Sequence, residues 1–364
     1  MSKWQKVKVQ DVCSKGTSSL SLKDLDGKDG DFPVYGAAGL AKKVNFYQQE
    51  NKYLAIIKDG AGVGRLYRFN GKTSVLGTMQ YIFQNVNIDY SFCYYALQSI
   101  DFKKYVNGAA IPHIYFKDYS QEEIPLPPME EQKKIAARLD AVSDLLTKQK
   151  QLLSEQDNLI QSTFYDMFGT IHLSQKSAVW EKIGKLARVV GGSTPKTSVA
   201  DYWDGSLNWF TPAELDNNSW YVYSSQRKIT TAGVQSCHLE KQPADTVILS
   251  SRAPIGKLAI AKKEFYCNQG FKNIICGKNL NSVWLYHLLM YNVDYLQSLG
   301  KGATFKEISK TIVENIEIPI PPLELQQKFA AIAEQIESEK SKIKSAIAET
   351  QTLFNALMAE YFEE

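Results

Sequence analysis

Residues 124–168 read IPLPPMEEQKKIAARLDAVSDLLTKQKQLLSEQDNLIQSTFYDMF, and residues 318–362 read IPIPPLELQQKFAAIAEQIESEKSKIKSAIAETQTLFNALMAEYF. The two stretches align without a gap at an offset of 194 positions, and 14 of the 45 aligned residues are identical. An internal repeat of this length means that one structural unit occurs twice in the chain of 364 residues.

The repeat extends upstream of these two stretches. Gly108-Ala109 pairs with Gly302-Ala303 at the same offset. The turn-like stretch Asp59-Gly-Ala-Gly-Val-Gly64 resembles Arg252-Ala-Pro-Ile-Gly256 at an offset of 192. The chain is therefore a tandem pair, in which a globular block is followed by a helical segment. The boundaries that we predict are 1–123 for the first block, 124–168 for the first helical segment, 169–317 for the second block and 318–364 for the second helical segment.

Both repeated stretches are predicted to form one long helix each. Each begins with a cluster of prolines that ends at Pro128 or Pro322, and neither proline nor glycine follows within 129–168 or 323–364. Proline is tolerated at the start of a helix but breaks its interior. The absence of both residue types predicts two unbroken helices of about 40 residues, or roughly 60 Å each.

Apolar residues recur along both helices at alternating spacings of four and three. A repeat of this kind kept over several heptads favours a coiled coil. We therefore expect the helices to pair with each other in an antiparallel arrangement that leaves part of their surface for another protein. A helix packed on its own block is the alternative. The residues of the predicted pairing seam are Ile135, Leu139, Val142, Leu146, Leu153, Ile160, Ile336, Ile343, Ile347, Phe354 and Leu357.

Charge is unevenly divided between the helices and the blocks. The two helical segments hold nine basic and fifteen acidic residues, whereas the blocks hold 33 basic and 24 acidic ones. The formal charge of the whole chain is only +3. A basic surplus confined to the blocks indicates contact with nucleic acid, while solvated surface lysine is the alternative reading.

The blocks are predicted to be mixed α/β. Short apolar runs such as 52–57 and 246–250 are typical of buried strands. We interpret 32–39, 191–196 and 201–209 as loops, because glycine, serine, threonine and proline punctuate them. Loops that carry Lys, Arg, Asn and Tyr on a rigid sheet suit contacts to phosphates and base edges.

Several protein classes are disfavoured by the composition. The five cysteines (Cys13, Cys93, Cys237, Cys267 and Cys276) show no CxxC spacing, so neither a zinc ribbon nor a disulfide framework is expected. No apolar run is long enough to span a membrane, and residues 1–10 lack the apolar core of a signal peptide. We therefore expect a cytoplasmic protein that binds no membrane and no metal.

A tryptophan-led block, a segment such as Gly302-Ala-Thr-Phe-Lys-Glu-Ile and the junction I-P-[LI]-P-P-[ML]-E-x-Q, all present twice, resemble the specificity subunit of type I restriction–modification systems. The resemblance covers nearly the whole chain. Its most specific part is the junction with Glu130 and Gln132, or Glu324 and Gln326. The first block departs from the pattern, since it is shorter and reads Gly108-Ala-Ala-Ile-Pro-His-Ile.

The resemblance implies a fold and a set of partners. The fold is two tandem target-recognition domains of mixed α/β (α+β) type, held apart by two long helices that form an antiparallel coiled coil. The partners are double-stranded DNA, two adenine-N6 methyltransferase subunits and, in the restricting complex, a motor–nuclease subunit. S-adenosylmethionine, and ATP with Mg²⁺ for restriction, would bind to those subunits, so no cofactor is expected in this chain. The divergence of the two blocks implies that they read different half-sites.

Candidate DNA contacts are basic or hydroxyl residues of the two blocks, because phosphate contacts supply most of the affinity for DNA. Arg252 is the preferred candidate for reading a base, since its planar guanidinium can hold guanine through two hydrogen bonds. Lys301 and Lys306 are weaker candidates. The full set is Lys58, Arg65, Arg68 and Lys72 in the first block, and Thr194, Lys196, Arg252, Lys257 and Lys272 in the second.

Catalytic motifs are not found in the sequence. Gly60-Ala-Gly62-Val-Gly64 is a weak glycine loop, and Ile255-Gly256-Lys257-Leu258 lacks the leading glycine and the Ser/Thr of a phosphate-binding loop. The four histidines show no spacing typical of metal ligands. We therefore expect a non-catalytic, sequence-specific DNA-binding subunit. The alternative is a coiled-coil interaction protein with two ligand-binding domains and no DNA role.

Overall fold

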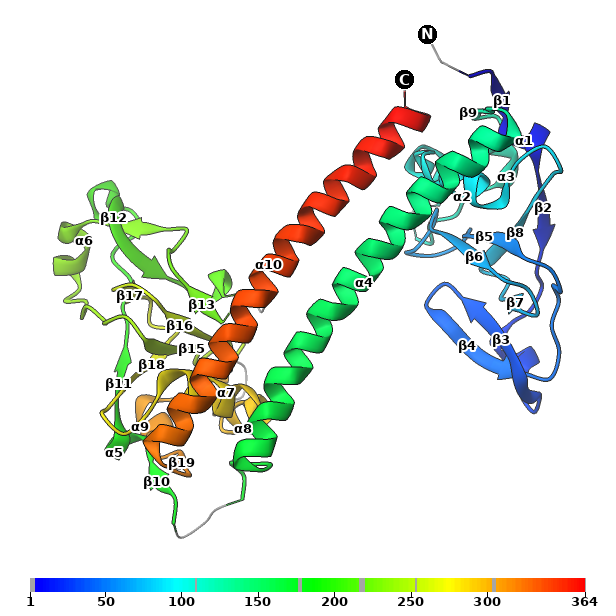
Figure 1. The fold of residues 1–364 in the computed structure, drawn as a ribbon. Helices are drawn as coiled ribbons and strands as arrows, with labels where there is room; N and C mark the ends of the chain where they lie inside the picture. Colours follow the sequence, from blue (N-terminus) through cyan, green and yellow to red (C-terminus); the bar gives the residue numbers. More distant parts are fainter. Residues whose placement is uncertain are drawn as a thin grey trace. The chain divides into compact units, whose positions relative to one another are not determined.

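The computed structural model of the chain describes residues 4–108, 110–175, 179–215, 220–252, 254–302 and 306–363. Two compact units divide the chain, and each unit takes a part of both long helices. Unit 1 consists of Met1–Leu152 with Ile343–Glu364, and unit 2 consists of Leu153–Lys342. Figure 1 labels the helices and strands of both.

Unit 1 contains an antiparallel sheet of strand order β2-β8-β5-β6. A smaller sheet of order β4-β3-β7 and a two-stranded ladder of β1 with β9 complete the strands of its described part. The strands are β1 (Lys6–Lys8), β2 (Cys13–Thr17), β3 (Asp29–Gly36), β4 (Gly39–Val44), β5 (Tyr53–Ile57), β6 (Leu66–Phe69), β7 (Ser74–Val75), β8 (Met79–Gln84) and β9 (Glu123–Pro125). The short helices are α1 (Val9–Val12), α2 (Tyr90–Gln98) and α3 (Phe116–Tyr119).

Strand β5 lies in the middle of unit 1 and is apolar throughout because both of its faces are covered. Side chains alternate across a strand. Leu54 and Ile56 belong to a core shared with α2, while Tyr53 and Ile57 belong to a second core on the other face. All five residues of the strand are buried. The apolar run predicted at 52–57 is therefore a strand.

Unit 2 repeats this plan. Its main sheet has the order β11-β18-β15-β16-β13, a second sheet has the order β14-β12-β17, and β10 pairs with β19. The strands are β10 (Glu181–Lys182), β11 (Ala187–Gly191), β12 (Trp203–Phe210), β13 (Tyr221–Val222), β14 (Lys228–Ile229), β15 (Thr246–Leu249), β16 (Leu258–Ala261), β17 (Tyr266–Cys267), β18 (Lys272–Cys276) and β19 (Glu317–Ile318). The short helices are α5 (Ile183–Leu186), α6 (Thr231–Ser236), α7 (Ser282–Met290), α8 (Val293–Ser298) and α9 (Lys310–Glu314).

The four strands β11-β18-β15-β16 have the same antiparallel order as β2-β8-β5-β6 in unit 1. Strand β13 adds a fifth, parallel strand beside β16 in unit 2. Strand β15 again faces two cores, with Val247 and Leu249 on one side and Ile248 on the other. The sequence repeat thus corresponds to a repeated sheet.

Two of the predicted loops are wrong. Residues 32–36 lie in β3, which pairs with β4 as a hairpin, and residues 203–209 lie in β12. Trp203, Trp209 and Ile229 form a small core, so apolar packing outweighs the Gly and Ser in this stretch. A shift in strand register after Trp203, with Asp204 at a φ of 57°, accommodates the turn-forming residues.

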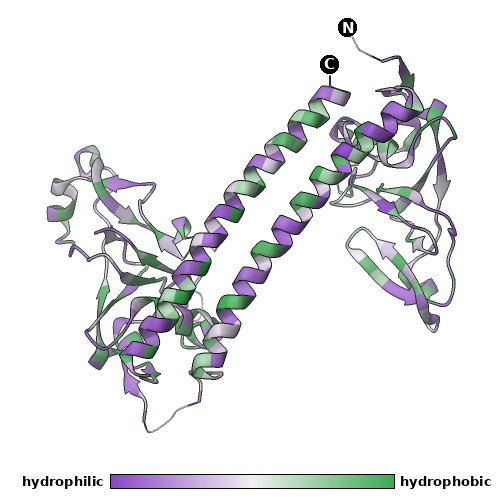
Figure 2. Cartoon of the chain, in the orientation of Figure 1, coloured by the Kyte–Doolittle hydropathy of each residue, from purple (hydrophilic) through white to green (hydrophobic). Residues whose placement is uncertain are grey.

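Two helices of 40 residues, α4 (Met129–Phe168) and α10 (Leu323–Phe362), follow the proline clusters as predicted. Hydrophobic and hydrophilic residues alternate along both (Figure 2). In unit 1, Arg138 donates to the Tyr361 hydroxyl at 2.9 Å and Gln149 donates to Thr350 at 3.2 Å. The residue numbers of the α10 partners fall as those of the α4 residues rise, so the two segments are antiparallel.

The same pairing occurs inside unit 2. Asp157 of α4 forms an ion pair with Lys340 of α10 at 2.5 Å. Further along, the ring of Phe164 packs 5.3 Å from the ring of Phe329. The expected fold class, mixed α/β with two tandem blocks and two long antiparallel helices, is confirmed.

All eleven residues of the predicted pairing seam are buried or half-buried. Part of the seam also packs on the blocks, because Ile135 and Leu139 share a core with α2 in unit 1, and Ile336 shares one with α7 in unit 2. The two predicted alternatives are thus combined. Each helix contacts the other helix as well as its own block.

Candidate nucleic-acid interface

In each block, two residues six positions apart are joined by a pair of backbone hydrogen bonds. In unit 1 the amide N–H of Asn107 donates to the carbonyl of His113, and the reverse hydrogen bond is also 2.8 Å long. In unit 2 the residues 194 positions later, Lys301 and Glu307, exchange the same two hydrogen bonds at 3.1 and 3.0 Å. Ala109 and Ala303–Phe305 of the repeated motif lie outside the described residues.

The second residue of each hydrogen-bonded pair, His113 or Glu307, also faces a different residue in each unit. His113 forms a backbone bridge with Asp59, and Glu307 forms one with Arg252. The two bridges are equivalent by position, yet an acid stands opposite a histidine in unit 1 and a cation stands opposite an acid in unit 2. The same backbone frame therefore presents two different surfaces.

Three of the five candidates in the second block gather beside this bridge in unit 2. Lys272, at the start of β18, donates to Glu307 at 3.2 Å and to the Ser251 hydroxyl at 3.2 Å. The guanidinium of Arg252 lies 4.0 Å from the same carboxylate. The hydroxyl of Thr194 donates to Gln269, whose backbone carbonyl accepts from Lys272 at 3.4 Å. We call Thr194, Arg252, Gln269, Lys272 and Glu307 the polar cluster of unit 2.

The polar cluster carries a net positive charge, because Arg252 and Lys272 share the single carboxylate of Glu307. The side chain of Arg252 is 39% exposed, whereas that of Lys272 is only 14% exposed. One carboxylate cannot neutralise two cations. The exposed guanidinium of Arg252 is therefore a favourable place for an incoming phosphate or base edge to bind.

The remaining candidates of unit 2 differ in their surroundings. Lys196 is exposed on the loop after β11. Lys257, in contrast, donates its ammonium to the carbonyls of Pro212 and Leu215, both at 2.9 Å, and so holds a neighbouring segment. Lys301 and Lys306 are also exposed. Contact with DNA stays a prediction for each of them.

In unit 1 two of the candidates, Lys58 and Arg65, lie at the turn between β5 and β6. Lys58 lies 3.7 Å from Asp59, and the side chain of Arg65 is exposed. Gly60 and Gly64 have φ values of 99° and 88°, which explains why glycine occupies both ends of this turn. Lys72 is exposed on a later turn. Lys58 and Arg65 are therefore neighbours, while Lys72 lies elsewhere on the unit.

Arg68 has a structural position. Its guanidinium forms an ion pair with Asp140 of α4 at 2.5 Å and stacks over the Tyr94 ring at 4.6 Å. The Tyr95 hydroxyl donates to the same carboxylate at 2.7 Å. Burial raises the pKa of Asp140, but the hydrogen bonds from Tyr95 and Arg68 outweigh it and hold that pKa below 3.8. Arg68 thus joins β6 to the long helix.

Arg227 is a candidate that the sequence analysis missed. Its guanidinium lies 3.8 Å from the centre of the Trp203 ring and 5.5 Å from that of Trp209, and the residue is exposed. Stacking on indole fixes the plane of a guanidinium and leaves its N–H groups free to point outward. No sequence signal pairs Arg227 with two tryptophans that lie 18 to 24 positions earlier.

Among the described residues, no group of three or more His, Cys, Asp and Glu side chains is placed to hold a metal ion. Likewise, no helix of the described part is both long and apolar enough to cross a bilayer.

Comparison with known proteins identifies the family. The sequence model of the type I restriction modification DNA specificity domain matches residues 1–155 and 179–350, which is most of the chain and one match for each repeat. The chain belongs to this family. The predicted resemblance is thereby confirmed.

Relatives and solved structures agree with that assignment. Over 155 residues the chain is 41% identical to the type I restriction enzyme MjaIX specificity subunit of Methanocaldococcus jannaschii, covering 42% of this chain and 36% of the relative. It is 29% identical to the putative MjaX specificity subunit of that organism, covering 67% of this chain and 60% of the relative. The chain thus spans about a third to three fifths of these relatives.

The fold is similar to that of the type I restriction–modification S subunit from M. genitalium. The TM-score is 0.69 at 14% sequence identity, and the alignment covers 100% of this chain and 96% of that one. At this identity the likeness concerns the fold.

Proposed function

We propose that this chain is the DNA-recognition subunit of a type I restriction–modification complex, in which each block reads one half of a bipartite site. The observation that carries the proposal is the pair of family matches, one on each repeat. The equivalent bridges Asp59–His113 and Arg252–Glu307 support it, because one backbone frame that carries different side chains suits two different half-sites.

Chemistry belongs to the partner subunits under this proposal. The chain binds double-stranded DNA and two adenine-N6 methyltransferase subunits, and a motor–nuclease subunit joins in restriction. S-adenosylmethionine, ATP and Mg²⁺ bind to those subunits. The helices α4 and α10 supply docking surface and set the spacing of the half-sites, and the protein acts in the cytoplasm.

Binding to DNA is tested directly by a filter-binding assay on duplex DNA across a salt series. Phosphate contacts release counter-ions, so the logarithm of the affinity should fall linearly with the logarithm of the salt concentration. If the chain did not bind duplex DNA even at low salt, the alternative of a coiled-coil interaction protein with no DNA role would be favoured.

Target recognition is tested by mapping N6-methyladenine across the genome of cells with and without this chain. One bipartite motif should lose its methylation when the chain is removed. Inserting four residues between Leu146 and Leu153 should change the spacer of that motif and leave both half-sites intact. An unchanged spacer would contradict the proposed role of the helices.

A further inference from the structure

Two tryptophans of β12 and one arginine form an exposed platform on the second sheet of unit 2. The guanidinium of Arg227 lies 3.8 Å from the centre of the Trp203 ring and 5.5 Å from that of Trp209. The two indoles meet edge to face at 5.0 Å, and both are buried, so their surroundings hold them in place. The arginine itself is exposed. We call Arg227, Trp203 and Trp209 the arginine–indole platform.

The backbone of Arg227 is fixed to the same strand. The hydroxyl of Ser225 donates to the carbonyl of Arg227 at 2.5 Å and accepts from the amide of Trp209 at 2.8 Å. Ser225 is buried, so these two hydrogen bonds are shielded from water. The backbone of the arginine is thus restrained through Ser225, and the plane of its guanidinium is restrained by the indoles. Much of the rotamer freedom that an arginine loses on binding is therefore already lost in the folded protein.

The same two indoles also hold the loop that follows β11. The indole N–H of Trp209 donates to the carbonyl of Ser193 at 3.1 Å, and that of Trp203 donates to the carbonyl of Lys196 at 3.2 Å. Between these two carbonyls lies Thr194, a member of the polar cluster of unit 2. The loop therefore connects the arginine–indole platform with the polar cluster.

The backbone directly after Trp203 departs from a regular strand. Trp203 and Leu207 both oppose Ile229 in the ladder of β12 with β14, so the register shifts between them. Asp204 has a φ of 57°, which is uncommon for a residue other than glycine. Bulges and strained backbone of this kind are concentrated at functional sites, where they redirect a side chain. Here they occur at the indole over which the guanidinium lies.

We propose that Arg227 reads a guanine in the half-site of unit 2 and that Trp203 is its positioning residue, an inference that rests on the proposed function. Two parallel hydrogen bonds from a guanidinium to O6 and N7 of guanine require a fixed plane. A phosphate requires charge but little orientation, and a flexible exposed lysine such as Lys196 provides it. Within the described part of the chain no carboxylate pairs with Arg227, whereas Arg252 lies beside Glu307.

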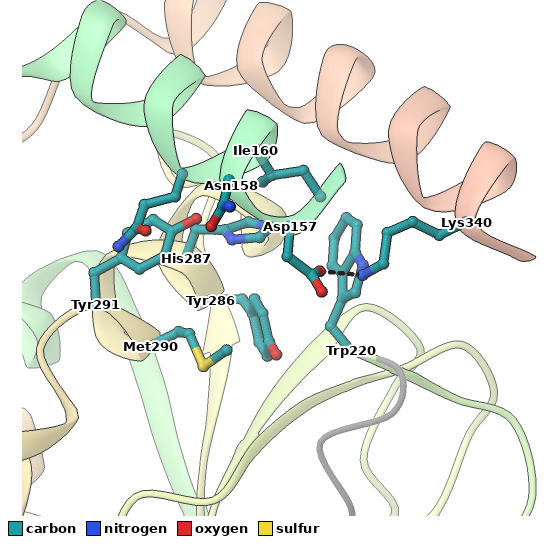
Figure 3. Close-up of a pocket in the computed structure, with 10 residues that line it drawn as sticks. Asp157, Asn158, Ile160, Trp220, Tyr286, His287, Met290, Tyr291 and Lys340 are labelled. Atoms are coloured by element: carbon teal, nitrogen blue, oxygen red, sulfur yellow. Dashed lines mark ion pairs between the residues drawn. The ribbon is translucent and has the colours of Figure 1, made fainter. Parts of the chain in front are cut away.

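Trp220, another buried tryptophan of unit 2, is packed differently. Its ring stacks with those of Tyr221 at 4.5 Å and Tyr286 at 5.7 Å. The ammonium of Lys340, which lines the same pocket, is paired with Asp157 at 2.5 Å (Figure 3). Among the described residues, no arginine stacks on this indole. Trp220 is therefore a matched control for Trp203, since it is a buried indole that positions no exposed guanidinium.

Filter binding of the full chain to duplexes that carry the methylated motif tests the proposal. We expect one G·C pair in one half-site whose replacement weakens binding of the wild-type chain by about five- to 150-fold. Replacing that guanine by 7-deazaguanine, which lacks the N7 acceptor, should reproduce part of the loss. Arg227→Ala removes the donors, so it should bind the intact and the altered duplexes with affinities within about twofold of each other.

Substitutions of the indole test the positioning role. Trp203→Leu removes the aromatic face and should reduce the discrimination at this base pair by about fivefold or more, whereas Trp203→Phe should retain most of it. Trp220→Phe should leave the discrimination unchanged, even where thermal unfolding shows a loss of stability. Arg188→Ala is the control for Arg227, because Arg188 is an exposed arginine that is already paired with Glu240, and it should also leave the discrimination unchanged.

The outcomes separate this inference from the proposed function. Wild-type discrimination in Arg227→Ala would overturn the inference, and so would a loss of affinity that is equal on all duplexes, because that would mark a phosphate contact. Equal discrimination in Trp203→Leu and the wild-type chain would overturn the positioning role. A chain that reads its motif without Arg227 contradicts only this inference, whereas a wild-type chain that binds no duplex contradicts the proposed function and this inference with it.

Discussion

Gln132 and Gln326 are equivalent residues of the repeat that make the same three hydrogen bonds. The side-chain carbonyl of Gln132 accepts from the amide of Asp89 at 2.7 Å, and that of Gln326 accepts from the amide of Asn281 at 2.9 Å. Asp89 and Asn281 are the N-caps of α2 and α7. Each glutamine also donates to two backbone carbonyls, one of them in the preceding proline cluster, at Pro127 or Pro321.

This glutamine fixes the first turn of each long helix to the helix of its block. The residue is 1% exposed in unit 1 and fully buried in unit 2. Replacement of either glutamine by alanine should lower the free energy of unfolding of its unit by about 2 kcal/mol, because a buried amide and two carbonyls lose their partner. Urea denaturation of Gln132→Ala and Gln326→Ala measures the change.

Lys133→Ala is the matched control for Gln132, since it is the next residue and is exposed. Its effect should stay within about 0.5 kcal/mol. Equal unfolding midpoints for Gln132→Ala and Lys133→Ala would contradict the role of the glutamine.

Lys340 is a buried cation in a position that is apolar in the other repeat. Its counterpart is Leu146, and that of its partner Glu337 is Ser143. Lys340→Leu alone should destabilise unit 2 by about 3 kcal/mol, because the carboxylate of Glu337 stays buried without that cation. Adding Glu337→Ser removes this buried carboxylate and installs the serine of unit 1, so it should recover most of the loss in the unfolding free energy.

The control for this cycle is Lys342→Leu, which removes an exposed ion pair with Glu339. Exposed pairs contribute little, so the change should be below about 1 kcal/mol. If the double variant were as unstable as Lys340→Leu, the destabilisation would come from the lost packing of the Lys340 side chain rather than from the unpaired carboxylate of Glu337.

Asp140 should make unit 1 sensitive to acid. Its pKa is lowered in the folded state, so its stabilising contribution is present above the unfolded pKa and is lost as the pH falls through the folded value. The window therefore lies from 3.8 downward. Asp140→Asn should flatten this part of the profile of stability against pH, measured by urea unfolding between pH 2 and 6. If Asp140→Asn lost stability in acid as steeply as the wild-type chain, other carboxylates would account for the acid sensitivity.

The sequence predicted the elements that depend on local pattern. Proline stops and 4-3 periodicity are local properties, so α4 and α10 begin at Met129 and Leu323, directly after the proline clusters. The repeat also singled out Gln132 and Gln326. Their role required the structure, because Asn87 and Asn279, whose carbonyls they contact, lie 45 and 47 positions away.

The candidate site was harder to predict, because a side chain's availability depends on tertiary partners. The sequence predicts a DNA contact at Lys257, yet two carbonyls from a distant segment hold its ammonium. It predicts another at Arg68, yet Asp140 of the long helix neutralises that cation. Arg227 was overlooked, since its exposure and orientation come from tryptophans on β12.

Arg252 and Glu307 allow a test in which two substitutions act in opposite directions on DNA affinity. If Arg252 reads a base, Arg252→Ala should weaken binding by about 1–3 kcal/mol, with the loss confined to one half-site. Equal weakening on all sequences would mark a phosphate contact instead. Glu307→Gln removes the carboxylate that competes for Arg252 and Lys272, so it should raise affinity and steepen the salt dependence. Filter binding on duplexes with single changes in either half-site measures both effects. An affinity that falls in Glu307→Gln would mean that the carboxylate positions the two cations rather than competing with DNA for them.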